Sequence, residues 1–172
     1  MLYTVKNDYL TITADTFGAE LHSIKGGEIE YLWQCGDSWK RYAPVLFPFI
    51  CSPTGKKYYA KGKEYTMPAN HGFARDSEFE FLKQTDNSVS FVLKSNEDTL
   101  KVYPYKFSLK ITYTLLDNGV ITSYTVENKD NKKIQIKYHD RNGEITERII
   151  EPYLILFKQI FVMFYFKYWR NL

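Results

Sequence analysis

The sequence predicts an all-β fold built from antiparallel strands. Short segments alternate between apolar and polar residues, turn-forming residues separate them, and aromatic residues, which favour strands, make up 17% of the chain. No window of eleven or more residues shows the 3.6-residue period of an amphipathic helix. A chain of 172 residues can form one domain with a core and is too short for two ordinary domains.

The expected strands follow one another in short hairpins. The first hairpin turns at residues 6–9, and Gly26-Gly27 separates a second pair of strands. Asp117-Asn118-Gly119 is the strongest hairpin signal, because Asn-Gly favours the turn whose twist matches that of the flanking strands. The expected strands are residues 3–5, 10–12, 21–24, 29–33, 78–82, 88–93, 107–115 and 120–126.

The middle of the chain, from Tyr42 to Asp76, breaks this pattern. It contains four of the six prolines, and proline cannot donate to a β-ladder. We therefore expect long loops with one short hairpin, in which residues 57–60 and 64–66 flank a turn at 61–63. Binding residues tend to lie on such loops when a rigid sheet supports them.

Charge and cysteine content argue against several function classes. The net charge is +3 with both signs mixed, which argues against a nucleic-acid surface. Cys35 and Cys51 have no metal-type spacing, so no metal site is predicted, and free thiols in a reducing cytoplasm are the simplest interpretation. The first ten residues lack a signal-peptide pattern, and the apolar stretch 160–166 is too short to span a bilayer. We expect a cytoplasmic protein without a membrane partner.

Residues 70–76, Asn-His-Gly-Phe-Ala-Arg-Asp, combine groups that can bind or protonate a ligand. Gly72 permits a sharp turn that can aim His71 into a cleft. An imidazole can donate to a hydroxyl or a ring oxygen near neutral pH, and the fork of Arg75 suits hydroxyls, carboxylates or phosphates. The structural alternative is that His71 caps a turn while Arg75 pairs with a neighbouring carboxylate.

Several long strings resemble the aldose 1-epimerase family, in particular its bacterial LacX-like branch. The resemblance covers residues 1–133 in nearly continuous register. The family fold is a β-supersandwich, two large twisted antiparallel sheets with a sugar cleft, so the resemblance implies a partial supersandwich of the galactose mutarotase type. The strings are 17–21, 42–50 (YAPVLFPFI), 59–65, 67–76 (MPANHGFARD) and 103–113.

The resemblance also implies an activity. In that family the pyranose ring opens and recloses, which interconverts the α and β anomers. A carboxylate takes the O1 proton, one histidine protonates the ring oxygen, and another binds and polarises the sugar. The resemblance assigns to His71 the catalytic position of the histidine that binds and polarises the sugar. It also implies that Asn70 and Arg75 contact a hexose or hexose phosphate, and that no cofactor is needed. An arginine that many relatives carry after the Phe-Pro segment is replaced by Cys51 and Ser52.

After Lys133 the resemblance ends. The family continues into a Gly-His-Pro strand with its second histidine and later reaches the catalytic glutamate, and neither has a counterpart here. His139 stands in a different kind of hairpin, and His22 is expected to be structural. We therefore expect catalysis to be impaired by truncation. Two function classes remain open, an epimerase acting on a hexose or hexose phosphate and a non-catalytic sugar-binding remnant.

Residues 136–153 resemble the opening of a WYL domain, the ligand-sensing module of bacterial transcription regulators, with a turn at Asn142-Gly143. The name-giving Trp-Tyr-Leu is absent, and a generic β-hairpin is the alternative. The sequence thus predicts a truncated epimerase-like domain over 1–133 and a WYL-like fragment over 134–172, a chimera with a partial regulatory module. We expect the tail to pack on the open face of the first part and replace some missing strands, with a loosely attached tail as the alternative. Exposed sheet edges should permit self-association.

Overall fold

The computed structural model describes the backbone of residues 1–139, 145–150 and 155–162, and the side chains of residues 1–134. Over these residues the chain forms three antiparallel sheets with very little helix, which confirms the predicted all-β class. Within the described residues no helix is long and apolar enough to cross a membrane.

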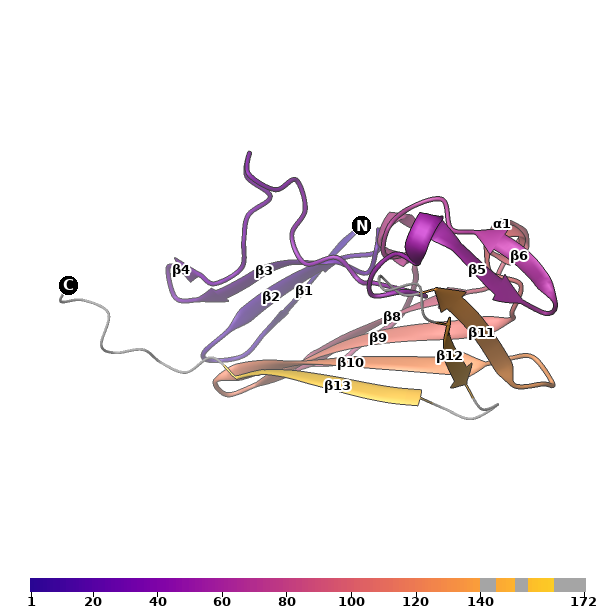
Figure 1. The fold of residues 1–172 in the computed structure, drawn as a ribbon. Coiled ribbons are helices and arrows are strands. Elements are labelled where there is room, and N and C mark those ends of the chain that lie inside the picture. The colour runs from indigo at the N-terminus through magenta and orange to yellow at the C-terminus, as the bar shows by residue number, and fades with distance from the viewer. Residues whose placement is uncertain (140–144, 151–154, 163–172) are drawn as a thin grey trace.

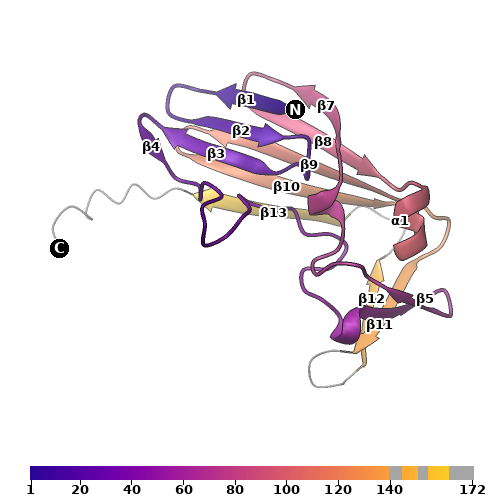
Figure 2. The ribbon, with the colours of Figure 1, turned by 90° about the horizontal axis from the view of Figure 1, so that it is seen from above.

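Two of the sheets form stacked layers (Figures 1 and 2). The upper sheet has the order β1-β2-β3-β4, and the lower sheet has the order β13-β10-β9-β8-β7. The upper strands are β1 (Leu2–Lys6), β2 (Thr11–Asp15), β3 (Leu21–Gly26) and β4 (Ile29–Glu30). The lower strands are β7 (Glu80–Gln84), β8 (Ser88–Lys94), β9 (Phe107–Leu116), β10 (Gly119–Asn128) and β13 (Ile155–Val162).

The core lies between these two layers because the strands alternate as the sequence predicts. In β9 every second side chain is buried, among them Leu109, Ile111 and Tyr113. The Tyr113 hydroxyl donates to the Ala19 carbonyl oxygen at 2.7 Å, which joins the lower sheet to the end of the β2–β3 connection. Burial raises the pKa of that hydroxyl well above its usual value, so it remains a donor.

The third sheet, β12-β11-β5-β6, stands at one end of the layers (Figure 1). Its strands β5 (Lys57–Ala60) and β6 (Lys63–Thr66) form the hairpin expected in the middle of the chain. Lys61 and Gly62 both have positive φ at its turn, 49° and 74°, as a tight hairpin turn of this hand requires. Tyr58 is fully buried, and its hydroxyl donates to the Val102 carbonyl oxygen.

A short helix, α1 (Glu97–Val102), differs from the sequence prediction, which contained no helix. Reciprocal capping explains its formation. The Asn96 side chain accepts from the Thr99 amide at 2.9 Å, and the Thr99 hydroxyl accepts from the Asn96 amide at 2.8 Å. Six residues are too few to produce a helical period in the sequence.

The tail joins the sheets at their edges. β11 (Ile134–His139) pairs with β12 (Ile145–Ile150), which confirms the predicted hairpin, although its turn at 142–143 lies outside the described residues. β11 also pairs with β5, and β13 pairs with β10 from Gly119 to Val126. The described strands of the tail thus extend two sheets at their edges. Packing of the tail on an open face stays a prediction. The division at residue 133 and the WYL resemblance stay predictions.

The strand β4 ends at Glu30, whose carboxylate closes the following turn. Glu30 accepts hydrogen bonds from the Ser23 hydroxyl at 2.6 Å and from the amides of Ile24 and Leu32 at 2.9 and 3.0 Å. Burial alone would raise the pKa of Glu30, but these hydrogen bonds outweigh it, so the pKa lies below the ordinary value of 4.5.

A depressed pKa predicts how stability depends on pH. The ionised Glu30 stabilises the fold above its unfolded pKa, and this contribution is lost as pH falls through the lower, folded pKa. We expect the free energy of unfolding of Glu30→Gln to vary less than that of the wild type between about pH 5 and 3, measured by urea titration. Glu28→Gln, the same change at an exposed neighbour, controls for net charge. Equal pH dependence in wild type and Glu30→Gln would contradict this account.

Candidate functional site

The turn that carries His71 is held against the Phe47-Pro48 segment. Phe47 and Gly72 form an isolated parallel bridge, and the Phe47 carbonyl oxygen accepts from the amides of Phe73 at 3.0 Å and Ala74 at 3.3 Å. Gly72 has φ +79°, and a Cβ there would lie 2.1 Å from the Phe47 oxygen. Only glycine therefore permits this approach, and two strings of family resemblance, 42–50 and 67–76, meet at this contact.

His71 has a φ of +67°, which is uncommon for a residue with a side chain. Its Nδ1 is hydrogen-bonded to the Ile50 carbonyl oxygen. Because a carbonyl oxygen only accepts, Nδ1 carries the hydrogen, and in the neutral ring Nε2 is then an acceptor. The ring is half-buried in an irregular segment outside the strands. Neutral His71 can accept from a ligand hydroxyl at Nε2, and protonated His71 can donate there.

Arg75 and Asp76 lie in the 3-10 turn of Ala74–Asp76 and share a network with Arg41. Arg41 donates to Asp76 Oδ1 at 2.7 Å and to the Arg75 carbonyl oxygen at 3.4 Å. The Arg75 Nε lies 3.5 Å from Asp76 Oδ2, as the structural alternative expects. That nitrogen is buried and makes no hydrogen bond of adequate geometry, and the side chain is 18% exposed. Asn70 is exposed beside His71.

Sequence reasoning missed Arg41 and a second group, Glu20. Glu20 is buried, and its Oε1 accepts from the Tyr42 amide at 2.9 Å. His22 stacks on the Tyr42 ring with centroids 4.1 Å apart, and its Nε2 lies 3.8 Å from Glu20 Oε2. These contacts support the structural interpretation of His22. Together Glu20 and Arg41 anchor the start of the 42–50 string. Their positions were a signal, because Glu20 lies within the 17–21 string and Arg41 directly precedes the 42–50 string.

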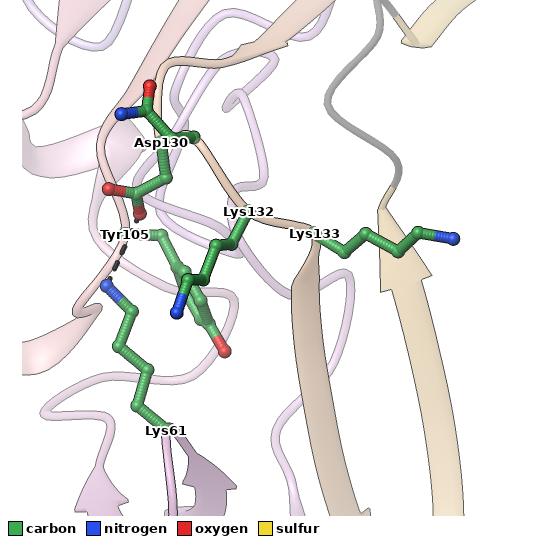
Figure 3. A pocket seen from close by; sticks show the side chains of 6 residues that line it. Lys61, Tyr105, Asp130, Lys132 and Lys133 are labelled. Atoms are coloured by element: carbon green, nitrogen blue, oxygen red, sulfur yellow. Dashed lines mark hydrogen bonds and ion pairs between the residues drawn. The ribbon is translucent and has the colours of Figure 1, made fainter.

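A shallow pocket of about 240 Å³ lies between the β5–β6 turn and the loop after β10 (Figure 3). Lys61 Nζ lies 3.4 Å from Asp130 Oδ2 and 4.8 Å from the Tyr105 ring centroid. Figure 3 shows Lys132 reaching toward the same hollow, whereas Lys133 points away. Neither His71 nor Arg75 lines it, so the sequence-predicted residues and this pocket are separate features.

A wider open groove of about 830 Å³ runs along the outer face of the lower sheet. Its lining includes four lysines, Lys94, Lys106, Lys110 and Lys129. Two of them are paired, Lys94 with Glu80 at 2.7 Å and Lys129 with Glu127 at 2.8 Å. The groove contains none of the predicted site residues. Within the described side chains, no group of three or more histidine, cysteine or acidic residues could hold a metal ion.

Comparison with known proteins identifies relatives of the chain. The family model described as aldose 1-epimerase matches residues 1–138. The plasmid-encoded protein LacX of Lactococcus lactis subsp. lactis is 36% identical over 141 residues, which cover 77% of this chain and 46% of LacX. The chain therefore spans about half the length of the curated relatives it matches.

Solved structures confirm the mutarotase-like β-sandwich. A galactose mutarotase related enzyme from Lactobacillus acidophilus superposes with a TM-score of 0.75 at 28% identity, covering 91% of this chain and 65% of its own. A galactose mutarotase-like protein from Lactobacillus casei ATCC 334 superposes with a TM-score of 0.72 at 35% identity. The match covers 80% of this chain and 49% of that protein. Because 91% of 172 residues exceeds the 138 that the family model matches, part of the later segment also superposes.

Proposed function

Because the chain belongs to the aldose 1-epimerase family, we propose that it binds a hexose or hexose phosphate at the turn of residues 70–76. The geometry of His71 supports this site. His71 is held in a left-handed conformation by the Gly72 contact, with Nδ1 occupied by the Ile50 carbonyl. Such backbone strain clusters at functional sites, because the surrounding structure must maintain it.

The proposed division of labour follows from the hydrogen-bonding groups. His71 Nε2 accepts from a sugar hydroxyl and orients the ring. Besides the buried Nε that faces Asp76, the Arg75 guanidinium has four further N–H donors, and the exposed Asn70 amide can donate or accept. Arg41 acts as a positioning residue, because it fixes the carboxylate that Arg75 faces. A phosphate on the sugar would add a charged partner for Arg75.

Interconversion of the anomers needs more than orientation. A base must remove the O1 proton and an acid must protonate the ring oxygen. Within the described side chains, which end at residue 134, neutral His71 carries no proton on Nε2 to donate and His22 is stacked on Tyr42 beside Glu20. We therefore propose that these 172 residues bind sugar without accelerating mutarotation. Epimerase activity is the second candidate, which family membership favours.

Sugar binding and mutarotation can be tested on one preparation. We expect saturation-transfer NMR to detect binding of galactose or glucose, and polarimetry to show mutarotation at the buffer rate. His71→Asn should weaken binding at least about tenfold, because asparagine tolerates positive φ but lacks the imidazole. The same change at His22, His22→Asn, serves as the matched control and should retain binding.

Two outcomes would contradict the proposal in different ways. Mutarotation above background that disappears in His71→Asn would show that the chain is catalytic and would favour the second candidate. Binding that survives His71→Asn unchanged would remove the 70–76 turn from the site.

A further inference from the structure

Two tryptophans face solvent on the loop that follows β4. Trp33 is 45% exposed and Trp39 is 49% exposed, although an indole is a costly group to leave in water. In Figure 1 the chain after β4 rises above the upper sheet before it returns to the layers. The exposure therefore belongs to a projecting loop and not to a fraying strand.

The loop holds these rings in defined positions. The Trp33 indole N–H donates to the Trp39 carbonyl oxygen at 2.8 Å, and the Trp39 amide donates to the Gly36 carbonyl oxygen at 3.2 Å. The Trp33 ring lies over Gly36, where a Cβ would come within 3.0 Å of it. Because the ring is already ordered, a ligand that stacks on it need not offset the entropy of fixing an indole.

The same loop is attached to the His71 turn. Arg41, two residues after Trp39, donates to Asp76 at 2.7 Å and to the Arg75 carbonyl oxygen. The following amide, that of Tyr42, donates to the buried Glu20. The aromatic loop and the proposed sugar site are thus joined through direct hydrogen bonds, and movement of one is restrained by the other.

We propose that Trp33 and Trp39 form a stacking platform for the pyranose ring of a carbohydrate, on the loop that Arg41 joins to the His71 turn. The proposal rests on the proposed sugar-binding function and adds to it a contact that His71 and Arg75 cannot provide. A pyranose has an apolar face of C–H groups that packs on an indole, and hydroxyls around its edge. The exposed Asp37 and Lys40 pair beside the rings supplies a carboxylate and an ammonium for those hydroxyls.

The size and polarity of this patch favour a sugar over a protein partner. Specific protein interfaces bury about 800 Å² on each partner around an apolar centre. Here charged groups border the two rings in the chain, because Asp37 lies between Trp33 and Trp39 and its ion-pair partner Lys40 directly follows Trp39. Such a small amphipathic surface matches one or two sugar rings.

Tryptophan fluorescence tests the platform in the full chain. Trp169→Phe removes the remaining tryptophan signal, so that emission reports Trp33 and Trp39 alone. We expect saturable quenching or a spectral shift on titration with galactose or glucose. Trp39→Ala should weaken binding about two- to tenfold, as expected for loss of one aromatic contact. Trp39→Phe should restore most of the affinity, which separates stacking from a general folding defect.

The matched control is Tyr9→Ala, which removes an aromatic ring that is 63% exposed on the β1–β2 turn and should not change binding. Binding detected by NMR without any fluorescence change, and with full affinity in Trp39→Ala, would overturn the platform and leave the proposed function intact. Absence of saturable binding by both methods would overturn the two together. If the double variant Trp33→Ala, Trp39→Ala bound sugar with full affinity, neither ring would contact the sugar and the platform would be overturned.

Discussion

Gly72→Ala is expected to lower the free energy of unfolding by about 2–5 kcal/mol. An alanine at φ +79° costs about 1–2 kcal/mol for the left-handed conformation. Its Cβ would also lie 2.1 Å from the Phe47 carbonyl oxygen and 2.5 Å from Pro48 Cδ, and overpacking of this kind adds about 1–3 kcal/mol. Denaturant titration of purified protein measures the change. Because relief requires backbone movement, sugar binding at His71 should be lost as well.

Gly62→Ala provides the matched control. Gly62 has nearly the same conformation, φ +74°, but a Cβ there would meet nothing within 4 Å. Gly62→Ala should therefore lower the free energy of unfolding only by the cost of the left-handed conformation, about 1–2 kcal/mol. If the two alanine variants lose equal stability, the contact between Gly72 and Phe47 contributes nothing, and the account of the His71 turn is wrong.

Deletion of residues 151–172 is expected to make the protein associate more strongly than the intact chain does. β13 covers β10 from Gly119 to Val126, and its removal would expose that row of backbone donors and acceptors. Unpaired edges of this length template pairing with other chains. Light scattering after size exclusion should show oligomers, and β10 amides should lose protection from hydrogen exchange. Self-association of the intact chain through its remaining edges stays a prediction.

A shorter deletion, residues 163–172, controls for loss of the C-terminal residues in general. It leaves β13 intact and should preserve the hydrodynamic behaviour of the full chain. If the variants lacking 151–172 and 163–172 gave similar size-exclusion and hydrogen-exchange profiles, pairing between β13 and β10 would not govern association.

Much of the fold could be predicted because strand alternation is local. The alternation in 107–115 and the Asn-Gly turn before β10 identify the central hairpin without reference to the rest of the chain. β4 was expected to run to residue 33 but ends at Glu30, because that carboxylate binds the Ile24 and Leu32 amides and closes the turn. Side-chain hydrogen bonds of this kind leave no period in a sequence.

The candidate site was only partly predictable, for a different reason. The 70–76 segment is contiguous, so its residues can be recognised together. Arg41 reaches it from a distant segment, and only tertiary structure brings Arg41 to Asp76 and Glu20 to the adjacent Tyr42 amide. The pairing partner of β13 was unpredictable for the same reason, since an alternating pattern tells which face is buried and not which strand is adjacent.

The third sheet imposes an order on folding during synthesis. Ala60 in β5 pairs with Ile136 in β11, so the β5–β6 hairpin leaves the ribosome about 4–15 s before its neighbour at ordinary elongation rates. An isolated two-stranded hairpin is marginally stable in water. The hairpin directly before the His71 turn therefore completes its sheet only after β11 has been translated. A nascent chain stalled before residue 134 would contain every residue of the proposed sugar site. It would lack β11, the strand that stabilises the adjacent β5–β6 hairpin.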